Sequence, residues 1–295
     1  MLVKYSCTAT KLTVGKCKER SFTIGLIVPA LTESFFDAAF SAIESAASSH
    51  NYSVMIGQSL ESVAREDFLI GLMMERNIDG LIISLSKHTI ADDQLAELRK
   101  LNIPVVYFDR IPDNKDIHYV AANLNTGMDH GIDSLAAMGH RKIGLINGPL
   151  QLISARYRLQ IYTERLKVNN LPFDARYVVG TDLSHHSNYN AIYRLLNLAD
   201  PPTAIITFND YVALDCQKAA AEFSNKENKL CFISFSNMPA WNYLEVRPYA
   251  SIEQFPAEQG RLAFEILSDL MANPLQNLPG ADYRQVHIDS KMVIL

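Results

Sequence analysis

The 295-residue sequence lacks the short motifs that mark many enzymes. It contains neither of the glycine-rich motifs that hold nucleotide phosphates, GxGxxG and GxxxxGK[ST], and it has no GxSxG nucleophile elbow. No nucleophile, base and orienting residue can be assembled from their spacing. These absences favour a binding protein over an enzyme, and we predict no organic cofactor.

Cysteines and long apolar runs are also scarce. The four cysteines form no CxxC pair, and none lies near a histidine at the spacing of metal ligands. We therefore predict reduced thiols in a cytoplasmic protein and no bound metal. No run approaches the length of a membrane span, and the first 20 residues have no apolar core like that of a secretory signal. A secretory signal peptide that preceded this sequence and was cleaved off is the alternative.

The net charge is also not that of a typical DNA-binding surface. At −5, with a pI of about 5.9, the chain as a whole is acidic. Surfaces that grip a phosphate backbone are usually basic, so we do not expect this chain to bind DNA strongly by itself.

What the sequence does have is a regular alternation of short apolar runs and longer amphipathic stretches. The apolar runs predict strands at 22–28, 52–56, 79–84, 103–108, 142–148, 177–180, 203–208 and 230–235, and two short closing strands at 284–288 and 292–295. The amphipathic stretches predict helices at 35–47, 63–76, 92–100, 127–138, 155–168, 190–199, 210–223 and 257–271. Apolar strands that alternate with helices are typical of parallel sheets, and the rhythm runs twice. The predicted fold is α/β, with two Rossmann-like doubly wound parallel-sheet subdomains.

Polar residues follow many of these strands. In doubly wound sheets, ligands bind beyond the carboxyl ends of the strands. Those positions are 32–36, 84–88, 109–110, 154–158, 209–210 and 236–237. One of them holds an unusual pair, Arg156 and Arg158, at the start of a predicted helix. The helix dipole disfavours cations at this end of a helix, so the presence of these two arginines needs another explanation, such as an ion pair or a ligand.

Several segments together resemble the effector-binding core of the lactose-repressor (LacI/GalR) family. The resemblance covers roughly residues 22–295 and is carried, in order, by FTIGLIVP, ESFFDAAFSAIESAA, NIDGLIIS, IPVVYFDR, GHRKIGLINGP, SARYR, PPTAIITFNDYVAL and SIEQF. It implies a type I periplasmic-binding-protein-like fold with a small molecule, usually a sugar or sugar derivative, in the cleft between the subdomains. It also implies a homodimer whose opening or closing sets the geometry of DNA-binding headpieces.

The resemblance also divides the chain. Residues 22–122 with 254–284 are expected to form the N-terminal subdomain, and residues 123–253 with 285–295 the C-terminal one. Residues 1–21 are expected to be a linker or hinge remnant, because a helix-turn-helix headpiece of about 50 residues does not fit there. Within this remnant, Leu12 is the candidate for the leucine that wedges into the minor groove, and a plain linker is the alternative. DNA binding is expected only through a headpiece not present in this chain.

The resemblance assigns candidate ligand-binding residues. Arg158, the second arginine of SARYR, matches the family's effector-binding arginine, and its rigid donor fork suits a carboxylate, a phosphate or vicinal hydroxyls. Asp109 is expected to accept sugar hydroxyls, or else to form an ion pair with Arg158. Asn209 is expected to bridge ligand hydroxyls or to cap the next helix. Phe36 is expected to stack on the ligand or to pack in the core. Arg156 is expected to be a structural ion-pair partner.

One position departs from the family pattern. Where the family usually has Gly-Phe-Asp, with the aspartate gripping ligand hydroxyls, this chain has Ser-Phe-Ser ending at Ser236. The lost carboxylate predicts a ligand that is less hydroxyl-rich, or more anionic, than a plain hexose. Asn237 or Trp241 are candidate substitutes. His185 lies where some members carry an aromatic residue beside the sugar.

Three functions compete at this stage. The first is the ligand-sensing core of a cytoplasmic, homodimeric transcriptional regulator. The second is a transport-type periplasmic sugar-binding protein, and the third is an enzyme on the same fold. The segments GHRKIG and DSKMVIL resemble the regulators rather than their secreted relatives, and nothing names a catalyst, so we favour the first.

Overall fold

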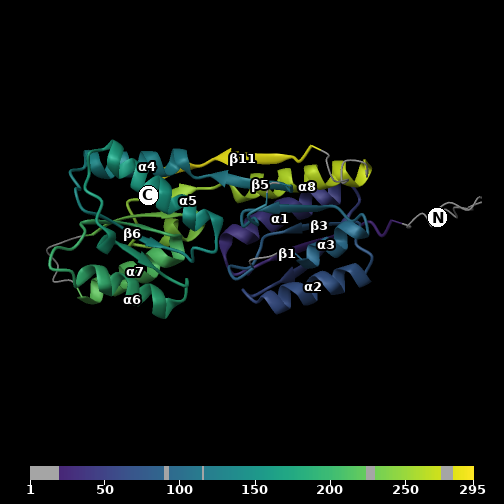
Figure 1. Cartoon of the computed structure of the whole chain (residues 1–295), viewed down its shortest axis with the longest axis horizontal. Coiled ribbons are helices and arrows are strands. Elements are labelled where there is room, and N and C mark those ends of the chain that lie inside the picture. Colours follow the sequence, from purple (N-terminus) through teal and green to yellow (C-terminus); the bar gives the residue numbers. More distant parts are fainter. Residues whose placement is uncertain (1–19, 90–92, 115, 224–229, 274–281) are drawn as a thin grey trace, which may run out of the picture.

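The chain forms two α/β subdomains that lie side by side along the long axis of the molecule (Figure 1). The computed structural model describes residues 20–295 except 90–92, 115, 224–229 and 274–281. Each subdomain contains one six-stranded sheet. The prediction of two parallel-dominated doubly wound sheets is therefore confirmed. Leu12 lies outside the described residues.

The first sheet has the strand order β11-β5-β4-β3-β1-β2, and all its neighbouring strands are parallel. One face is covered by α1 and α8 and the other by α2 and α3, each over its own apolar cluster. Gly260 lets α8 approach α1, because a Cβ at this position would lie 2.5 Å from the carbonyl oxygen of Ala39. The elements of this subdomain are β1 Thr23–Val28, α1 Ser34–Ser49, β2 Ser53–Gln58, α2 Val63–Glu75, β3 Gly80–Ile83, α3 Asp93–Lys100, β4 Val105–Phe108, β5 His118–Asn123, α8 Pro256–Ala272 and β11 Gln285–Asp289.

The second sheet has the strand order β12-β10-β9-β8-β6-β7, in which only the pairing of β12 with β10 is antiparallel among the described strands. Helices α4 and α5 cover one face, and α6 and α7 the other. The elements are α4 Asn125–Ala137, β6 Ile143–Asn147, α5 Ile153–Val168, η1 Ala175–Tyr177, β7 Val178–Gly180, α6 His185–Leu196, β8 Ala204–Thr207, α7 Asp210–Phe223, β9 Cys231–Phe235, η2 Pro239–Tyr243, β10 Ala250–Glu253 and β12 Lys291–Ile294.

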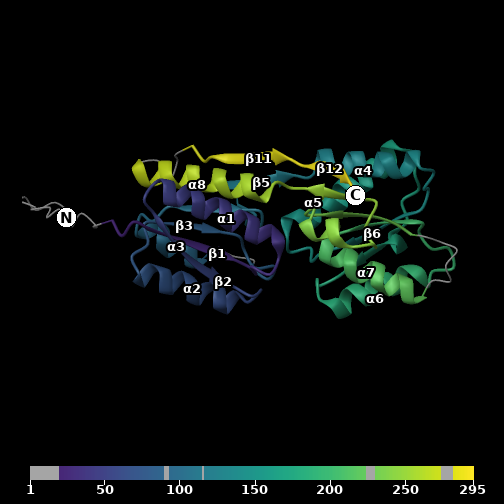
Figure 2. The same ribbon diagram turned by 180° about the vertical axis from the view of Figure 1, so that it is seen from behind.

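The described chain crosses between the sheets three times: after β5, after β10, and between β11 and β12 (Figure 2). The last crossing corrects the predicted division, which gave 285–295 to the C-terminal subdomain. Residues 285–289 pair with β5 in the first sheet, and only 291–294 join the second. Ser290 anchors the switch, because both its N–H and its Oγ donate to the carbonyl oxygen of Asn123. The sequence of residues 285–289 is short and largely polar, so it does not by itself indicate which of the two sheets this strand joins.

The local pattern also missed two strands and misplaced one helix start. Strands β5 and β10 were not predicted, and α6 begins at His185 rather than at residue 190. Among the described helices, none combines the length and apolarity needed to cross a bilayer.

Candidate ligand-binding site

A cavity of about 30 Å³, partly open to solvent, lies where the carboxyl ends of the two sheets face each other. Five of the seven predicted ligand-binding residues line it: Phe36, Asp109, Arg158, Asn209 and Ser236. The remaining lining residues are Glu33, Phe35, Arg110, Ser154, Phe208 and Gln254. Both subdomains and one crossing segment therefore contribute to a single site.

Arg158 is the most unusual residue of this cavity. Only 3% of the residue is exposed, and the guanidinium carbon lies 4.2 Å from the ring centroids of both Phe208 and Phe235. Within the described chain, its Nε and Nη1 have no hydrogen-bond partner. Burial lowers the pKa of Arg158 to about 9, against the attraction of Asp109, so the group stays cationic at neutral pH. The two rings offset part of the desolvation cost, but a buried cation with unmet donors still needs an acceptor.

Arg156 has a different role, as predicted. Its Nη1 donates to the carbonyl oxygens of Leu150 and Gln151, and its Nη2 forms a 2.8 Å ion pair with Asp113. Asp113 belongs to the loop after β4 of the first subdomain, so this structural pair also joins the two subdomains.

An acidic wall faces Arg158 from the first subdomain. Asp109 follows β4 with a left-handed φ of 56°, and its carboxylate is 4.0 Å from Nε of Arg110. Burial raises the pKa of Asp109, and the charges of Arg110 and Arg158 oppose the rise. No described residue donates a hydrogen bond to this carboxylate, so it can accept from a ligand.

Glu33 is a lining residue that the sequence analysis did not single out. It precedes α1, yet its side chain does not cap that helix. Burial raises the pKa of Glu33, and the charge of Arg110 acts in the opposite direction. Its sequence signals were its place in segment 32–36 after the first strand and at the start of the resembling segment ESFFDAAFSAIESAA, neither of which assigned it a role.

Asn209 caps α7, which was one of its two predicted roles. Its Oδ1 accepts a 3.0 Å hydrogen bond from the N–H of Val212. The residue also lines the cavity. This capping hydrogen bond fixes the Asn209 side chain at the N-terminus of α7. The amide nitrogen of Asn209 can still donate to a ligand.

Asp210, fully buried beside Asn209, positions the segment that carries Ser236. Its carboxylate accepts from the hydroxyls of Ser234 and Ser251 (2.7 Å to the latter) and from the N–H of Met238 (2.6 Å). Ser236 itself has a φ of 103°, a strained region for a residue with a Cβ. The buried carboxylate therefore ties β9, β10 and the following turn together against that strain.

Two predicted residues do not belong to this site. Trp241 is buried in η2 against Ala213 and Met238, and it lines a different cavity. His185 has a side chain that is 93% exposed, and its Nδ1 lies 2.8 Å from Asp215. Both placements correct the sequence prediction. His185 is the first residue of α6, and the family alignment that suggested it did not reveal that the helix begins there.

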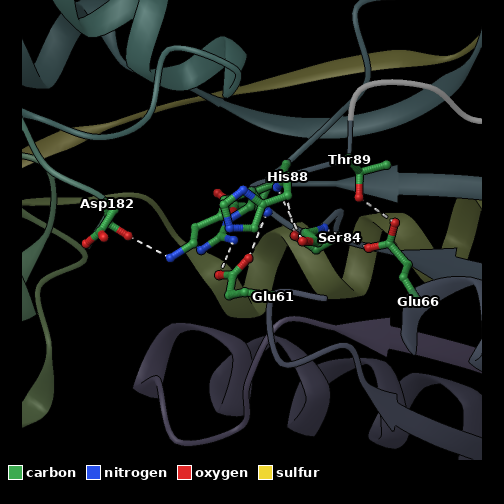
Figure 3. A network of polar contacts seen from close by, with 10 residues as sticks. Glu61, Glu66, Ser84, His88, Thr89 and Asp182 are labelled. Carbon is green, nitrogen blue, oxygen red and sulfur yellow. Dashed lines mark hydrogen bonds and ion pairs between the residues drawn. The ribbon is translucent and has the colours of Figure 1, made fainter. Parts of the chain in front are cut away.

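A polar network leads from the cavity wall to the other subdomain (Figure 3). Arg110 Nη1 pairs with Oε1 of Glu61 at 2.6 Å, and Oε2 of Glu61 accepts from the N–H of Lys87 at 2.7 Å. Lys87 Nζ then donates to the carbonyl oxygen of Asp182 at 2.6 Å. Glu66 holds the same loop by accepting from the N–H of Ser86 and from Oγ1 of Thr89, as Figure 3 shows for Thr89.

A tyrosine makes a further contact between the subdomains. The hydroxyl of Tyr211, on α7, donates to the carbonyl oxygen of Thr32 at 3.1 Å and accepts from the N–H of Ser34 at 3.2 Å. It thereby satisfies an N–H in the first turn of α1, which has no cap from its own N-cap side chain. Together with Lys87–Asp182 and Arg156–Asp113, this contact joins the subdomains around the cavity.

Comparison with known proteins agrees with this architecture. Residues 21–292 match the family described as periplasmic binding proteins and sugar binding domain of LacI family. The HTH-type transcriptional repressor CytR of Escherichia coli (strain K12) is 29% identical over 255 residues, which is 86% of this chain and 74% of that protein. The structure of a putative ribose operon repressor from Burkholderia thailandensis has a TM-score of 0.82 at 24% identity, covering 94% of this chain and 100% of that one. A LacI family transcriptional regulator from Enterococcus faecium with bound ribose has a TM-score of 0.76 at 22% identity, covering 92% and 96%.

Proposed function

This chain belongs to the family of periplasmic binding proteins and LacI-type sugar-binding domains, and we propose that it is the ligand-sensing core of a transcriptional regulator that binds a sugar-like effector between its subdomains. The observation that carries this proposal is Arg158, a buried cation with unmet donors at the carboxyl ends of the strands. No catalytic step is part of the proposal.

The cavity suits a small polyhydroxylated molecule. Asp109 and Glu33 offer acceptors, Arg158 and Asn209 offer donors, and the ring of Phe36 lines the same space. Hydroxyl groups both donate and accept, and the C–H faces of sugar rings pack on aromatic rings. The bound ribose in the Enterococcus faecium regulator is consistent with a ligand of this class.

The signal in this proposal is a change in subdomain closure. The contacts of Tyr211, Lys87 and Arg156 join the two subdomains, and in this proposal they belong to the closed arrangement. A ligand that binds this arrangement better than an open one shifts the population toward it, and the coupling equals the difference in affinity. In a cytoplasmic homodimer, that shift would change the spacing of DNA-binding headpieces.

A thermal-shift and calorimetric screen tests the proposal. We expect pentoses or hexoses to raise the melting temperature, because a ligand at a hundred times its Kd stabilises the folded state by about 2.7 kcal/mol. The panel includes pentoses, hexoses, sugar acids and sugar phosphates. If no member of the panel binds to the wild-type chain, the proposed function is wrong.

Replacing Tyr211 with phenylalanine should weaken ligand binding about twofold to tenfold. The change removes only the hydroxyl that joins Thr32 and Ser34 to α7, worth about 0.5–1.5 kcal/mol, and leaves the cavity lining intact. Isothermal titration measures the effect. The matched control is Tyr193→Phe on the exposed face of α6, and equal affinities of the two variants would show that the Tyr211 contact does not favour the bound state.

A further inference from the structure

Glu61 connects a residue of the cavity wall with a loop that reaches the other subdomain. Its Oε1 pairs with Nη1 of Arg110 at 2.6 Å, and its Oε2 accepts from the N–H of Lys87 at 2.7 Å (Figure 3). Among the described residues, Arg110 lines the cavity and Glu61 does not. Nζ of Lys87 donates to the carbonyl oxygen of Asp182, which follows β7 of the second subdomain, at 2.6 Å. One carboxylate therefore lies between the cavity wall and a contact across the cleft.

The backbone that carries Glu61 is strained. Leu60 and Glu61 have left-handed φ angles of 50° and 59°, and the N–H of Ser62 donates to the carbonyl oxygen of Ser59 at 3.0 Å, which closes the turn between β2 and α2. Two consecutive left-handed residues favour glycine or asparagine, and this turn has neither. Such strain persists only where surrounding contacts hold it, and it concentrates at functional positions. The contacts of the Glu61 carboxylate with Arg110 and Lys87 are contacts of this kind.

Glu61 and a carboxylate of the cavity compete for the same cation. Burial opposes the ionisation of Glu61, but the charge of Arg110 and the hydrogen bonds from Lys87 and Arg110 outweigh it and lower the pKa of Glu61. Arg110 is buried, and its Nε lies 4.0 Å from the carboxylate of Asp109, which lines the cavity. The guanidinium of Arg110 is therefore paired with Glu61 and also attracted by Asp109.

The loop that carries Lys87 is attached to the same wall. The N–H of Leu85 donates to the carbonyl oxygen of Arg110 at 3.1 Å. Glu66 accepts from the N–H of Ser86 and from Oγ1 of Thr89, both at 2.7 Å. Because this loop is bound both to Arg110 and to Glu61, a change at the cavity wall reaches Lys87 through a short chain of hydrogen bonds.

We propose that Glu61 is a positioning residue that couples the cavity to a latch across the cleft, the hydrogen bond from Lys87 to Asp182. The inference rests on the proposed function. A bound molecule that donates to Asp109 removes the competitor for Arg110, so Arg110 stays paired with Glu61. Glu61 in turn holds the Lys87 loop where Nζ reaches Asp182. Occupancy of the cavity thus favours the closed latch, and the closed latch slows dissociation.

Surface plasmon resonance and calorimetry on Glu61→Gln test this inference. The probe is the tightest binder among D-ribose, D-xylose, D-glucose, D-gluconate and D-ribose 5-phosphate. The amide removes the charge that holds Arg110 and leaves the cavity lining unchanged, so we expect the probe to dissociate about tenfold faster. Glu97→Gln removes a carboxylate whose ion pair with Lys100 is exposed on α3, and it should match the wild type. Thermal melts establish that both variants fold.

A double-mutant cycle with Lys87→Met tests whether Glu61 acts through the latch. Lys87→Met removes the contact with Asp182 and keeps the N–H that donates to Glu61, so it should also speed dissociation about tenfold. If the two residues act in series, Glu61→Gln adds less than about threefold to Lys87→Met, whereas independent effects would multiply to about a hundredfold. The cycle is repeated with Glu61→Asp, which keeps the charge but is one methylene shorter and cannot reach both partners, and we expect the same result.

The outcomes separate this inference from the proposed function. Wild-type dissociation rates in both Glu61 variants, with or without a lower melting temperature, would overturn the positioning role and leave the proposed function standing. Effects of Glu61 and Lys87 that multiply would overturn the coupling in the same way. If none of the five probes binds the wild type, both the inference and the proposed function fail.

Discussion

Replacing Arg158 with methionine is expected to lower ligand affinity at least about a hundredfold, roughly 2.7 kcal/mol, without lowering the free energy of unfolding. Truncation of a buried, hydrogen-bonded charge at a binding site costs about 2–5 kcal/mol, because the partner group is left unpaired. In the free protein, the guanidinium beside Phe208 and Phe235 is buried with unmet hydrogen-bond donors, which destabilises the folded state. Removing the charge therefore removes this unfavourable desolvation energy. A methionine side chain fills the slot between the two rings with an apolar, adaptable chain.

Calorimetric titration measures the affinity, and urea unfolding at neutral pH measures the stability. Arg158→Lys keeps the charge but loses the planar fork, so we expect an intermediate affinity. Arg156→Met, two positions earlier on the same helix, removes only the exposed contacts of that residue and should have the smaller effect on affinity. A large loss of stability in Arg158→Met with unchanged affinity would make Arg158 a structural residue rather than a ligand-binding one.

Replacing Asp210 with alanine is expected to lower the free energy of unfolding by about 3–5 kcal/mol. The carboxylate is fully buried and accepts from Ser234, Ser251 and Met238, and its removal leaves three buried donors without an acceptor. Each such group costs about 1–3 kcal/mol. Because the same carboxylate holds the turn that carries Ser236, ligand affinity should fall as well.

Urea unfolding checks this expectation, with Glu222→Ala as the control on the same helix. Glu222 is exposed and accepts a hydrogen bond from the hydroxyl of Tyr189, so its loss should change stability by no more than about 0.5 kcal/mol. If Asp210→Ala unfolds as the control does, the three hydrogen bonds do not hold the turn in solution.

Some elements were easy to predict and others were not, for identifiable reasons. Helix α1 was predicted at 35–47 and is observed at Ser34–Ser49, because its apolar residues Phe36, Ala39, Ile43 and Ala47 repeat at helical spacing. Strand β5, with the sequence HYVAAN, was missed because it is short and ends in polar residues. Strand β11 was assigned to the wrong subdomain, since its partner β5 lies more than 160 residues earlier in the chain.

The same contrast holds for the cavity. Arg158, Asp109 and Asn209 were predicted from the chemistry of strand ends and from the family resemblance, and they come together around one cavity. Trp241 was named as a substitute for the carboxylate missing at position 236, and His185 by its alignment with an aromatic residue of the family, and both lie elsewhere. Glu33 begins the resembling segment ESFFDAAFSAIESAA but was assigned no role, because a single glutamate before a helix is as consistent with a solvated turn as with a ligand contact.

Local pattern was enough to establish the α/β alternation, the two subdomains and the strand ends that meet at the cavity. These features depend on the period of apolar residues and on short polar segments, both of which can be seen within a few neighbouring positions. Tertiary structure alone decided that Arg158 lacks an acceptor, that Glu33 faces the ligand space and that Tyr211 caps α1 from the other subdomain. Each of these depends on which groups meet across the cleft, and the groups that meet there are separated by tens to hundreds of residues in the chain.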